Sequence, residues 1–303
     1  MVDASVTHER PASASDYLAL LKPRVMSLVV FTGLVGYVAA PGQGDWILGF
    51  AAILAIAVGA GASGALNMWF DSDIDAVMTR TRTRPIPAGR VAREEALMLG
   101  LTLSALSVLT MQLAAGPLAA GLLAFTIFFY AVVYTMWLKR WTPQNIVIGG
   151  LAGALPPAIA WAAKTGALNL DAVLLVAIIF MWTPPHFWAL SLLQHRDYAD
   201  AKVPMLPVTH GAKSTRMHIF AYSLLLMPFV IAPAFTGLGG LAYTAVAGVG
   251  GAFFLFLAWR ILRSQAGEGE PTQDKPARDL FGFSILYLFA LFAVILVEKA
   301  VGA

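Results

Sequence analysis

Residues 219–259 read IFAYSLLLMPFVIAPAFTGLGGLAYTAVAGVGGAFFLFLAW and contain no Asp, Glu, Lys or Arg. About 20 apolar residues in a helix suffice to cross the hydrocarbon core of a bilayer, so this uncharged run is too long for one crossing. The GLGG sequence at 237–240 is a turn signal near its middle. The stretch therefore predicts two adjacent transmembrane helices joined by a tight turn.

The composition of the whole chain agrees with this interpretation. Of its 303 residues, 59% are hydrophobic and only 12% are charged, whereas a soluble domain is about a quarter charged. This balance excludes a water-soluble globular domain and a disordered chain. The long apolar runs favour helices over the short alternating strands of a membrane β-barrel. The absence of cysteine excludes disulfides, thiolate catalysis and Cys-ligated metals.

Long runs without charged residues predict nine transmembrane helices in an all-α bundle around one central cavity. The predicted spans are approximately 25–44, 46–66, 96–115, 118–137, 146–163, 172–193, 218–236, 239–259 and 280–297. Residues 1–24 are expected to form an N-terminal leader, and 25–299 a single polytopic domain with two long acidic loops, at about 67–94 and 194–217.

The basic residues predict the orientation of this bundle. With nine spans, 18 of the 20 Lys and Arg residues fall on the side of the N-terminus, and only Lys164 and Lys299 fall on the other. Positive charge collects on the cytoplasmic side of membrane proteins. We therefore expect a cytoplasmic N-terminus, a C-terminus on the periplasmic or outer side, and both acidic loops facing the cytoplasm.

The first acidic loop opens with three oxygen-bearing side chains spaced four residues apart: Asn67, Asp71 and Asp75. On a helix this spacing places all three on one face. Carboxylate and amide oxygens gathered in this way suit Mg²⁺, which leaves coordination positions open for phosphate oxygens. Asp73 falls on the other side of the helix. The pattern predicts a magnesium site at the membrane surface, although any single Asp at a helix end can be an ordinary interfacial charge.

The second acidic loop carries Asp197 and Asp200, three residues apart. Tyr198 lies between them and is a candidate hydrogen-bond donor to a phosphate oxygen. The two clusters are four spans apart and are expected to face each other across the cavity. Basic residues near them could neutralise a bound polyanion. The enrichment of Lys and Arg on the cytoplasmic side already explains most of these residues, and we favour Arg24 and Lys202 as functional. The candidates are Arg24, Arg80, Arg82, Arg84, Lys139, Arg140 and Lys202.

Two metal-binding acidic clusters with basic neighbours suit a diphosphate, and the apolar spans suit a long hydrocarbon tail. An isoprenyl diphosphate combines both features. Its chemistry is ionisation of the carbon–oxygen bond to an allylic cation, which an electron-rich acceptor then traps. Metal ions and positive charge stabilise the leaving diphosphate, and aromatic faces tolerate the carbocation.

At these residues the sequence resembles the UbiA superfamily of intramembrane prenyltransferases. Asn67, Asp71 and Asp75 match the superfamily's first motif, Asn-x-x-x-Asp-x-x-x-Asp, in full. The second motif is commonly Asp-x-x-x-Asp, and here Ala201 stands four residues after Asp197 while the acid is Asp200. The resemblance implies Mg²⁺ ligands at Asn67, Asp71, Asp75, Asp197 and Asp200.

Longer segments resemble one family within this superfamily, the protohaem IX farnesyltransferases or haem O synthases. They are TRTRPIPAGR, YTMWLKRWTPQNIVIGGLAGALPP, MWTPPHFWALSL and DYADAKVPMLPVTHG, and the resemblance covers roughly residues 17–300. It implies transfer of the farnesyl group of farnesyl diphosphate, with water, to a vinyl group of haem B. It also implies a bacterial inner membrane, a place in haem A biosynthesis, and haem A synthase or oxidase assembly proteins as partners. No nucleic-acid partner is expected.

His186 is the main candidate for a haem contact, because an ionisable side chain inside a span marks a site by default. A structural hydrogen bond beside Pro184 and Pro185 is the competing interpretation. His195 and His210 in the second acidic loop are weaker candidates for a propionate or phosphate contact. Two other functions stay open on the sequence. One is a prenyltransferase for an aromatic or chlorin acceptor such as 4-hydroxybenzoate, homogentisate or a chlorophyllide. The other is a haem carrier or transporter without catalytic activity.

Overall fold

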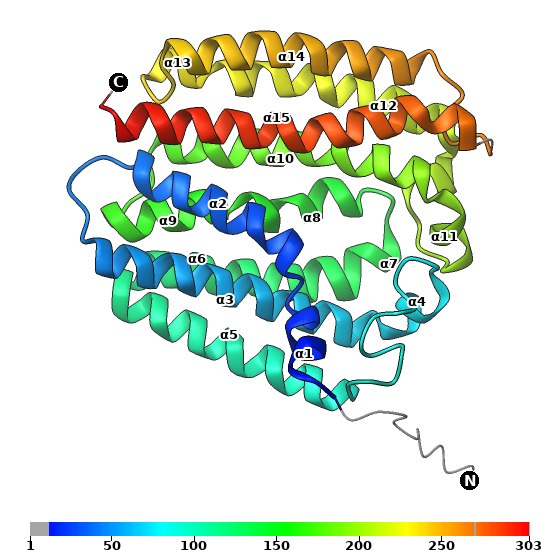
Figure 1. The fold of residues 1–303 in the computed structure, drawn as a ribbon, viewed down its shortest axis with the longest axis horizontal. Coiled ribbons are helices and arrows are strands. Elements are labelled where there is room, and N and C mark those ends of the chain that lie inside the picture. The colour runs from blue at the N-terminus through cyan, green and yellow to red at the C-terminus, as the bar shows by residue number, and fades with distance from the viewer. Residues whose placement is uncertain (1–11, 270, 303) are drawn as a thin grey trace.

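The computed structural model describes residues 12–269 and 271–302, and within these ranges the chain is helical without a β-strand (Figure 1). The elements are α1 (Ala14–Leu20), α2 (Pro23–Ala39), α3 (Trp46–Phe70), α4 (Ser72–Val77), α5 (Arg93–Ala115), α6 (Pro117–Phe128), the π-helix η1 (Phe129–Leu138), α7 (Lys139–Trp141), α8 (Asn145–Ala154), α9 (Pro156–Thr165), α10 (Leu170–Leu193), α11 (His195–Asp200), α12 (Leu206–Ile231), α13 (Pro233–Thr236), α14 (Leu241–Leu262), the 3₁₀ helix η2 (Pro271–Asp274) and α15 (Lys275–Ala300).

The predicted helical bundle is confirmed. Eight helical segments of the described residues are long and apolar enough to cross a membrane, and α1 with α2, bent by 54°, makes a ninth if the pair counts as one span. The glycine turn at 237–240 separates α13 from α14 as predicted, and Gly237 adopts a positive φ of 80°. The orientation relative to the two sides of a membrane stays a prediction.

One predicted boundary is wrong. The helix of the seventh span begins directly after Gly211 rather than near 218. Gly211 has non-helical angles, φ 79° and ψ 165°, and it kinks the chain between this helix and a short helical segment that starts at Leu206, where Pro207 suits the first turn. The predicted leader contains α1, which is bent away from α2 at Lys22. Residues 1–11 of that leader lie outside the described residues.

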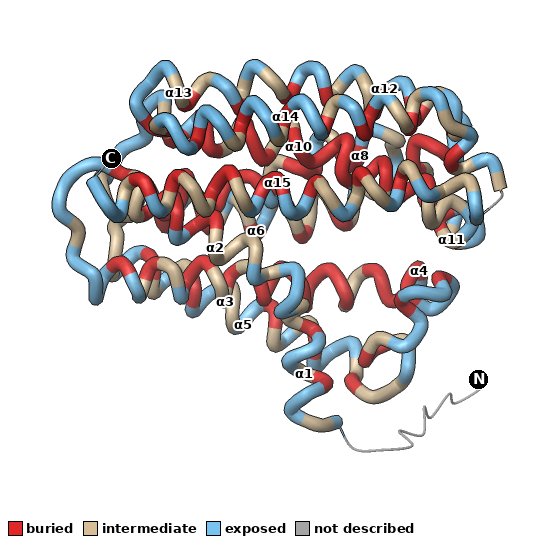
Figure 2. The backbone as a smooth tube through the Cα atoms, turned by 45° about the horizontal axis from the view of Figure 1, so that its top comes forward, coloured by how far each residue is buried: buried red, intermediate tan, exposed pale blue. Residues whose placement is uncertain are grey.

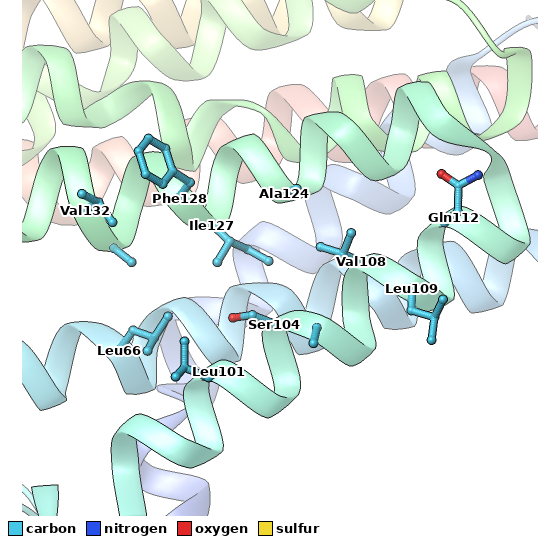
Figure 3. Close-up of a pocket in the computed structure, with 12 residues that line it drawn as sticks. Leu66, Leu101, Ser104, Val108, Leu109, Gln112, Ala124, Ile127, Phe128 and Val132 are labelled. Atoms are coloured by element: carbon cyan, nitrogen blue, oxygen red, sulfur yellow. The ribbon is translucent and has the colours of Figure 1, made fainter. Parts of the chain in front are cut away.

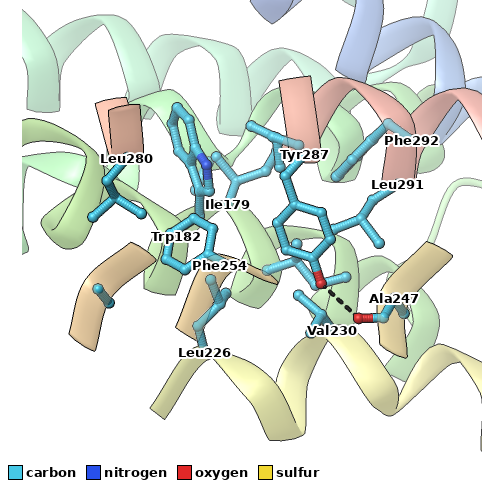
Figure 4. Packing of buried hydrophobic residues seen from close by; sticks show 14 of the residues in the cluster. Ile179, Trp182, Leu226, Val230, Ala247, Phe254, Leu280, Tyr287, Leu291 and Phe292 are labelled. Carbon is cyan, nitrogen blue, oxygen red and sulfur yellow. Dashed lines mark hydrogen bonds between the residues drawn. The ribbon is translucent and has the colours of Figure 1, made fainter. Parts of the chain in front are cut away.

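Buried residues face one another along the long helices (Figure 2). The largest hydrophobic cluster lies between α10, α12, α14 and α15 and is built around fully buried aromatic rings. Figure 4 shows Tyr287, whose hydroxyl donates to the Ala247 carbonyl at 2.9 Å. Tyr243 likewise donates to Val230 at 2.7 Å. Because these hydroxyls find partners, the rings contribute apolar burial without an unsatisfied polar group.

The short helices α4 and α11, which interrupt the two acidic loops, lie at one end of the bundle together with α7 (Figure 1). The first and last described helices bring their termini to opposite ends. Arg90, in the loop before α5, pairs with Asp16 of α1 at 2.7 Å, whereas Lys299 near the end of α15 donates to Gly237. The two predicted acidic loops therefore share an end, which we call the acidic end.

Candidate active site

The end of α3 and the beginning of α4 carry the first acidic motif on one helical path. The Asp71 amide donates to the Asn67 carbonyl at 2.9 Å, and the Asp75 amide donates to the Asp71 carbonyl at 2.8 Å. The four-residue spacing therefore keeps its helical register across the junction at Asp71. All three side chains are buried, with 4%, 0% and 2% of their surface exposed.

Each of these three buried side chains accepts a hydrogen bond from a different basic residue. Lys22 Nζ lies 2.5 Å from Asn67 Oδ1, and Lys139 Nζ lies 2.5 Å from Asp71 Oδ2. Arg84 Nη1 lies 2.7 Å from Asp75 Oδ2. The basic groups thus offset the cost of burying two carboxylates at low exposure.

A further arginine, Arg140, joins α7 to α4 on the outer side of this motif. Arg140 forms a bidentate pair with Asp73 at 2.8 Å for both contacts, and its Nη2 is 3.5 Å from Asp71 Oδ1. The hydrogen bond from this guanidinium lowers the pKa of the Asp73 carboxyl. Asp73, predicted to lie off the ligand face, is indeed exposed and pairs with Arg140.

The π-helix η1 brings two polar groups to the motif. Thr135 Oγ1 donates to the Tyr130 carbonyl five residues earlier at 2.8 Å and accepts from Asn67 Nδ2 at 3.0 Å. Lys139 follows directly after η1. Wide helical turns of this kind occur often at functional sites. Sequence reasoning missed Thr135 because a wide turn leaves no clear periodic signal.

The second acidic loop contacts the first through Arg80. The Arg80 amide lies 3.4 Å from Asp197 Oδ2, and its Nε donates to Gln194 Oε1 at 3.1 Å. Tyr198 is buried in a small cluster with Ile74 and Met78 of the first loop. Burial raises the pKa of the Tyr198 hydroxyl, which therefore stays protonated as a hydrogen-bond donor. The expected convergence of the two loops on one end is present.

Two lysines at the acidic end have strained backbones. Lys22, with φ 51°, and Lys202, with φ 55°, are the non-glycine residues with positive φ among those that the structure describes. Such conformations cost about 1–3 kcal/mol and cluster at functional sites. Lys22 was not among the predicted site residues, although its place directly before Pro23 and span one was the available signal.

Several predicted site residues lie outside this cluster. Arg24, Arg82, Asp200 and Lys202 are exposed, and their side chains form no hydrogen bond or ion pair with other described residues. His186 lies in the core, where its Nδ1 is 2.7 Å from Ser284 Oγ and its ring stacks against Trp182 and Phe281. These contacts account for a buried histidine in structural terms, and its predicted contact with haem stays a prediction.

The donor types of the first motif fit a hard divalent cation. Asp71 Oδ1 is buried and accepts no hydrogen bond from the described residues, and it stands beside amide and carboxylate oxygens. The predicted ligands are not yet gathered, since no three His, Asp or Glu side chains in the described parts of the chain could share one ion. For a metal ion to bind here, the lysine and arginine side chains would need to move away from these carboxylates.

A shallow apolar groove begins beside the motif, at Leu66, and runs between α3, α5, α6 and η1 (Figure 3). Its volume is about 640 Å³, and Ser104 and Gln112 are its polar contributors. It opens on the flank of the bundle and is separate from the acid cluster.

Comparison with known proteins assigns the chain to a family. The model of the UbiA prenyltransferase family matches residues 29–273, and the chain belongs to this family. Within it, the chain is 61% identical to the protein of Caulobacter sp. (strain K31) named protoheme IX farnesyltransferase, over 99% of this chain and 93% of that protein. It is 62% identical to the protein of the same name from Azorhizobium caulinodans, over 94% and 92% of the two chains. The resemblance inferred from the sequence is confirmed.

Solved structures share the fold at low sequence identity. A digeranylgeranylglyceryl phosphate synthase matches with a TM-score of 0.76 at 16% identity, over 94% of this chain and 98% of that one. A UbiA homolog from Archaeoglobus fulgidus, bound to GPP and Mg²⁺, matches with a TM-score of 0.70 at 16% identity, over 92% and 99%. These matches support the bundle architecture.

Proposed function

We propose that this chain is a protohaem IX farnesyltransferase that acts in a bacterial inner membrane. The observation that carries the acceptor assignment is the 61% identity to a protein of that name over nearly the whole length of both chains. The buried cluster of Asn67, Asp71 and Asp75, each contacted by a basic side chain, supports the diphosphate half of the reaction.

The reaction begins with heterolysis of the bond between C1 of the farnesyl group and the diphosphate oxygen, which keeps the electron pair. The π electrons of a haem B vinyl group then bond to C1. The oxygen of water bonds to the other vinyl carbon and loses its proton, which gives the hydroxyethylfarnesyl side chain of haem O. The chain needs no nucleophile of its own for these steps.

The basic residues at the acidic end have the chemistry to hold the leaving diphosphate. Lys22, Lys139 and Arg84 bond to the acidic motif, and on substrate binding we infer that they turn to phosphate oxygens. Arg80 already contacts both acidic loops. It can bring Asp197 and Tyr198 toward the same anion. Preorganised cations of this kind stabilise charge that develops on a leaving group.

Mg²⁺ is the cofactor that this donor set suits, with Asn67, Asp71 and Asp75 as ligands from one loop and Asp197 and Asp200 from the other. Bound there, the metal would neutralise diphosphate oxygens and assist departure of the leaving group. The solved homolog from Archaeoglobus fulgidus described as bound to GPP and Mg²⁺ supports this choice.

The decisive experiment uses the purified full-length chain in lipid nanodiscs with farnesyl diphosphate, haem B and Mg²⁺. We expect a product with the mass of haem O, and its loss when EDTA replaces Mg²⁺. Product from 4-hydroxybenzoate, homogentisate or a chlorophyllide but none from haem B would overturn the acceptor assignment.

A non-catalytic haem carrier predicts a different pattern. It would bind haem B equally well as wild type and as Asp71→Asn, and neither would form product. Binding of haem A synthase to the nanodiscs tests the expected partner independently, because it does not depend on turnover.

A further inference from the structure

The end of the bundle opposite the acidic end contains a polar cavity of about 800 Å³. Its wall is formed by the end of α2, the start of α3, α9, the start of α10, the turn before α14 and the end of α15. Its volume lies within the range of small-molecule sites. None of the residues assigned to prenyl transfer lines it.

Two lysines line this cavity, and each is only partly committed. Lys164 Nζ donates to the Ala40 carbonyl at 2.6 Å, and Lys299 Nζ donates to the Gly237 carbonyl at 2.8 Å. Both carbonyls lie at helix C-termini, so capping explains one bond of each lysine. An ammonium group has three donors, which leaves further donors for a ligand.

A carboxylate shares the same cavity without pairing to either lysine. Asp171 Oδ1 is buried and makes no hydrogen bond, and no ion pair joins Asp171 to Lys164 or Lys299 within the described chain. Unpaired charges of opposite sign around one cavity at low exposure are costly. A ligand that carries both charges would satisfy them together.

We propose that this cavity binds the headgroup of a phospholipid that carries both a phosphate and a primary ammonium group, as phosphatidylethanolamine does. The phosphate accepts from Lys164 and Lys299, and the ammonium donates to Asp171 Oδ1. Val38, Leu238 and Leu296 give the same cavity an apolar wall, which suits the first part of the acyl chains. A lipid fits better than soluble phosphoethanolamine because the cavity lies at the ends of membrane-spanning helices and has this apolar wall.

The test measures lipid binding to the delipidated full-length protein in detergent by native mass spectrometry. Phosphatidylethanolamine, phosphatidylcholine and phosphatidylglycerol with identical acyl chains are compared, with soluble phosphoethanolamine as a separate arm. We expect phosphatidylethanolamine to bind at least tenfold more tightly than phosphatidylcholine, whose quaternary ammonium cannot donate a hydrogen bond. Tight binding of soluble phosphoethanolamine alone would reject the lipid.

Variants separate the two halves of the headgroup. Asp171→Asn should abolish the preference for phosphatidylethanolamine over phosphatidylcholine and leave phosphatidylglycerol binding intact, which also shows that the variant is folded. Lys164→Gln with Lys299→Gln should weaken all three lipids about tenfold or more. Lys213→Gln, an exposed lysine on α12, is the matched control and should change nothing. Equal binding of the three lipids to wild type, or an unchanged preference in Asp171→Asn, would overturn the proposal.

Discussion

The contact between Asp71 and Lys139 permits a test that separates a catalytic carboxylate from a structural one. Asp71 is fully buried, Lys139 is 15% exposed, and their charged atoms are 2.5 Å apart. Asp71→Asn leaves the ammonium without its charged partner, and Lys139→Gln leaves the carboxylate with Asn67 at 2.8 Å and the more distant Arg140 at 3.5 Å. If the carboxylate also serves the diphosphate chemistry, removing both charges should repair stability but not activity.

The size of the stability effect follows from the geometry. A hydrogen bond to a charged group contributes about 1.5–3 kcal/mol, and breaking a fully buried pair costs about 3–5 kcal/mol. Because Lys139 can reach solvent, we expect about 2 kcal/mol for each single variant. The double variant should be more stable than either single one, with a coupling free energy of at least about 1 kcal/mol.

The activity should follow a different pattern. Haem O formation should fall more than about 100-fold in Asp71→Asn, equivalent to about 2.7 kcal/mol of transition-state stabilisation, and should stay low in the double variant. Haem O formation is measured by mass spectrometry, and stability is measured separately by unfolding the protein in detergent. Lys275→Gln, which removes a pair between exposed groups, is the control, with an effect below about 1 kcal/mol. Recovery of activity with stability in the double variant would refute a chemical role for Asp71.

Three further variants test other parts of the structure. Glu298, buried on α15, accepts hydrogen bonds from the Gly240 and Tyr243 amides at the start of α14 at 2.7 and 3.0 Å. Glu298→Ala should therefore lower the free energy of unfolding by about 1–2 kcal/mol and leave kcat unchanged. An unchanged stability would contradict the capping role of Glu298. A Cβ on Gly36 would come within 2.2 Å of the Pro157 carbonyl oxygen, so Gly36→Ala should destabilise the packing of α2 on α9 by about 1–3 kcal/mol, whereas Gly121→Ala, with open space at its Cβ, should not. Arg140 lowers the pKa of Asp73 from 3.8, so the contribution of this ion pair to the free energy of unfolding is present above pH 3.8 and is lost as the pH falls further. Because Asp73 is exposed, this contribution stays below about 1 kcal/mol. The stability of Asp73→Asn should therefore depend less on acid pH than that of wild type.

The spans could be predicted from the sequence because hydrocarbon thickness sets a minimum length for an uncharged run. The glycine turn at 237–240 was equally visible. The early start of α12 was not, because residues 206–217 carry charges and a glycine that read as a loop. Here helical turns on both sides of the kink at Gly211 precede the apolar segment, and hydropathy has no signal for them.

The acidic motif could be predicted because a four-residue spacing keeps side chains on one helical face, and its three members are buried together. The choice among basic residues could not. Arg24 was favoured by its position, yet it is exposed, and the neighbouring Lys22 reaches Asn67 instead. The left-handed backbone at Lys22 decides which side chain turns inward, and no local pattern predicts such a conformation at a lysine.

The π-helical turns of η1 make the length of this segment as consequential as its composition. A π-helix has more residues per turn than an α-helix and so rotates by less than about 100° per residue, and deleting one residue between 129 and 138 would change the direction of everything after it relative to α6. Lys139 would then swing away from Asp71 although every functional group remained in the chain. Relatives that keep these contacts must therefore keep the residue count here, even where they replace the apolar side chains freely.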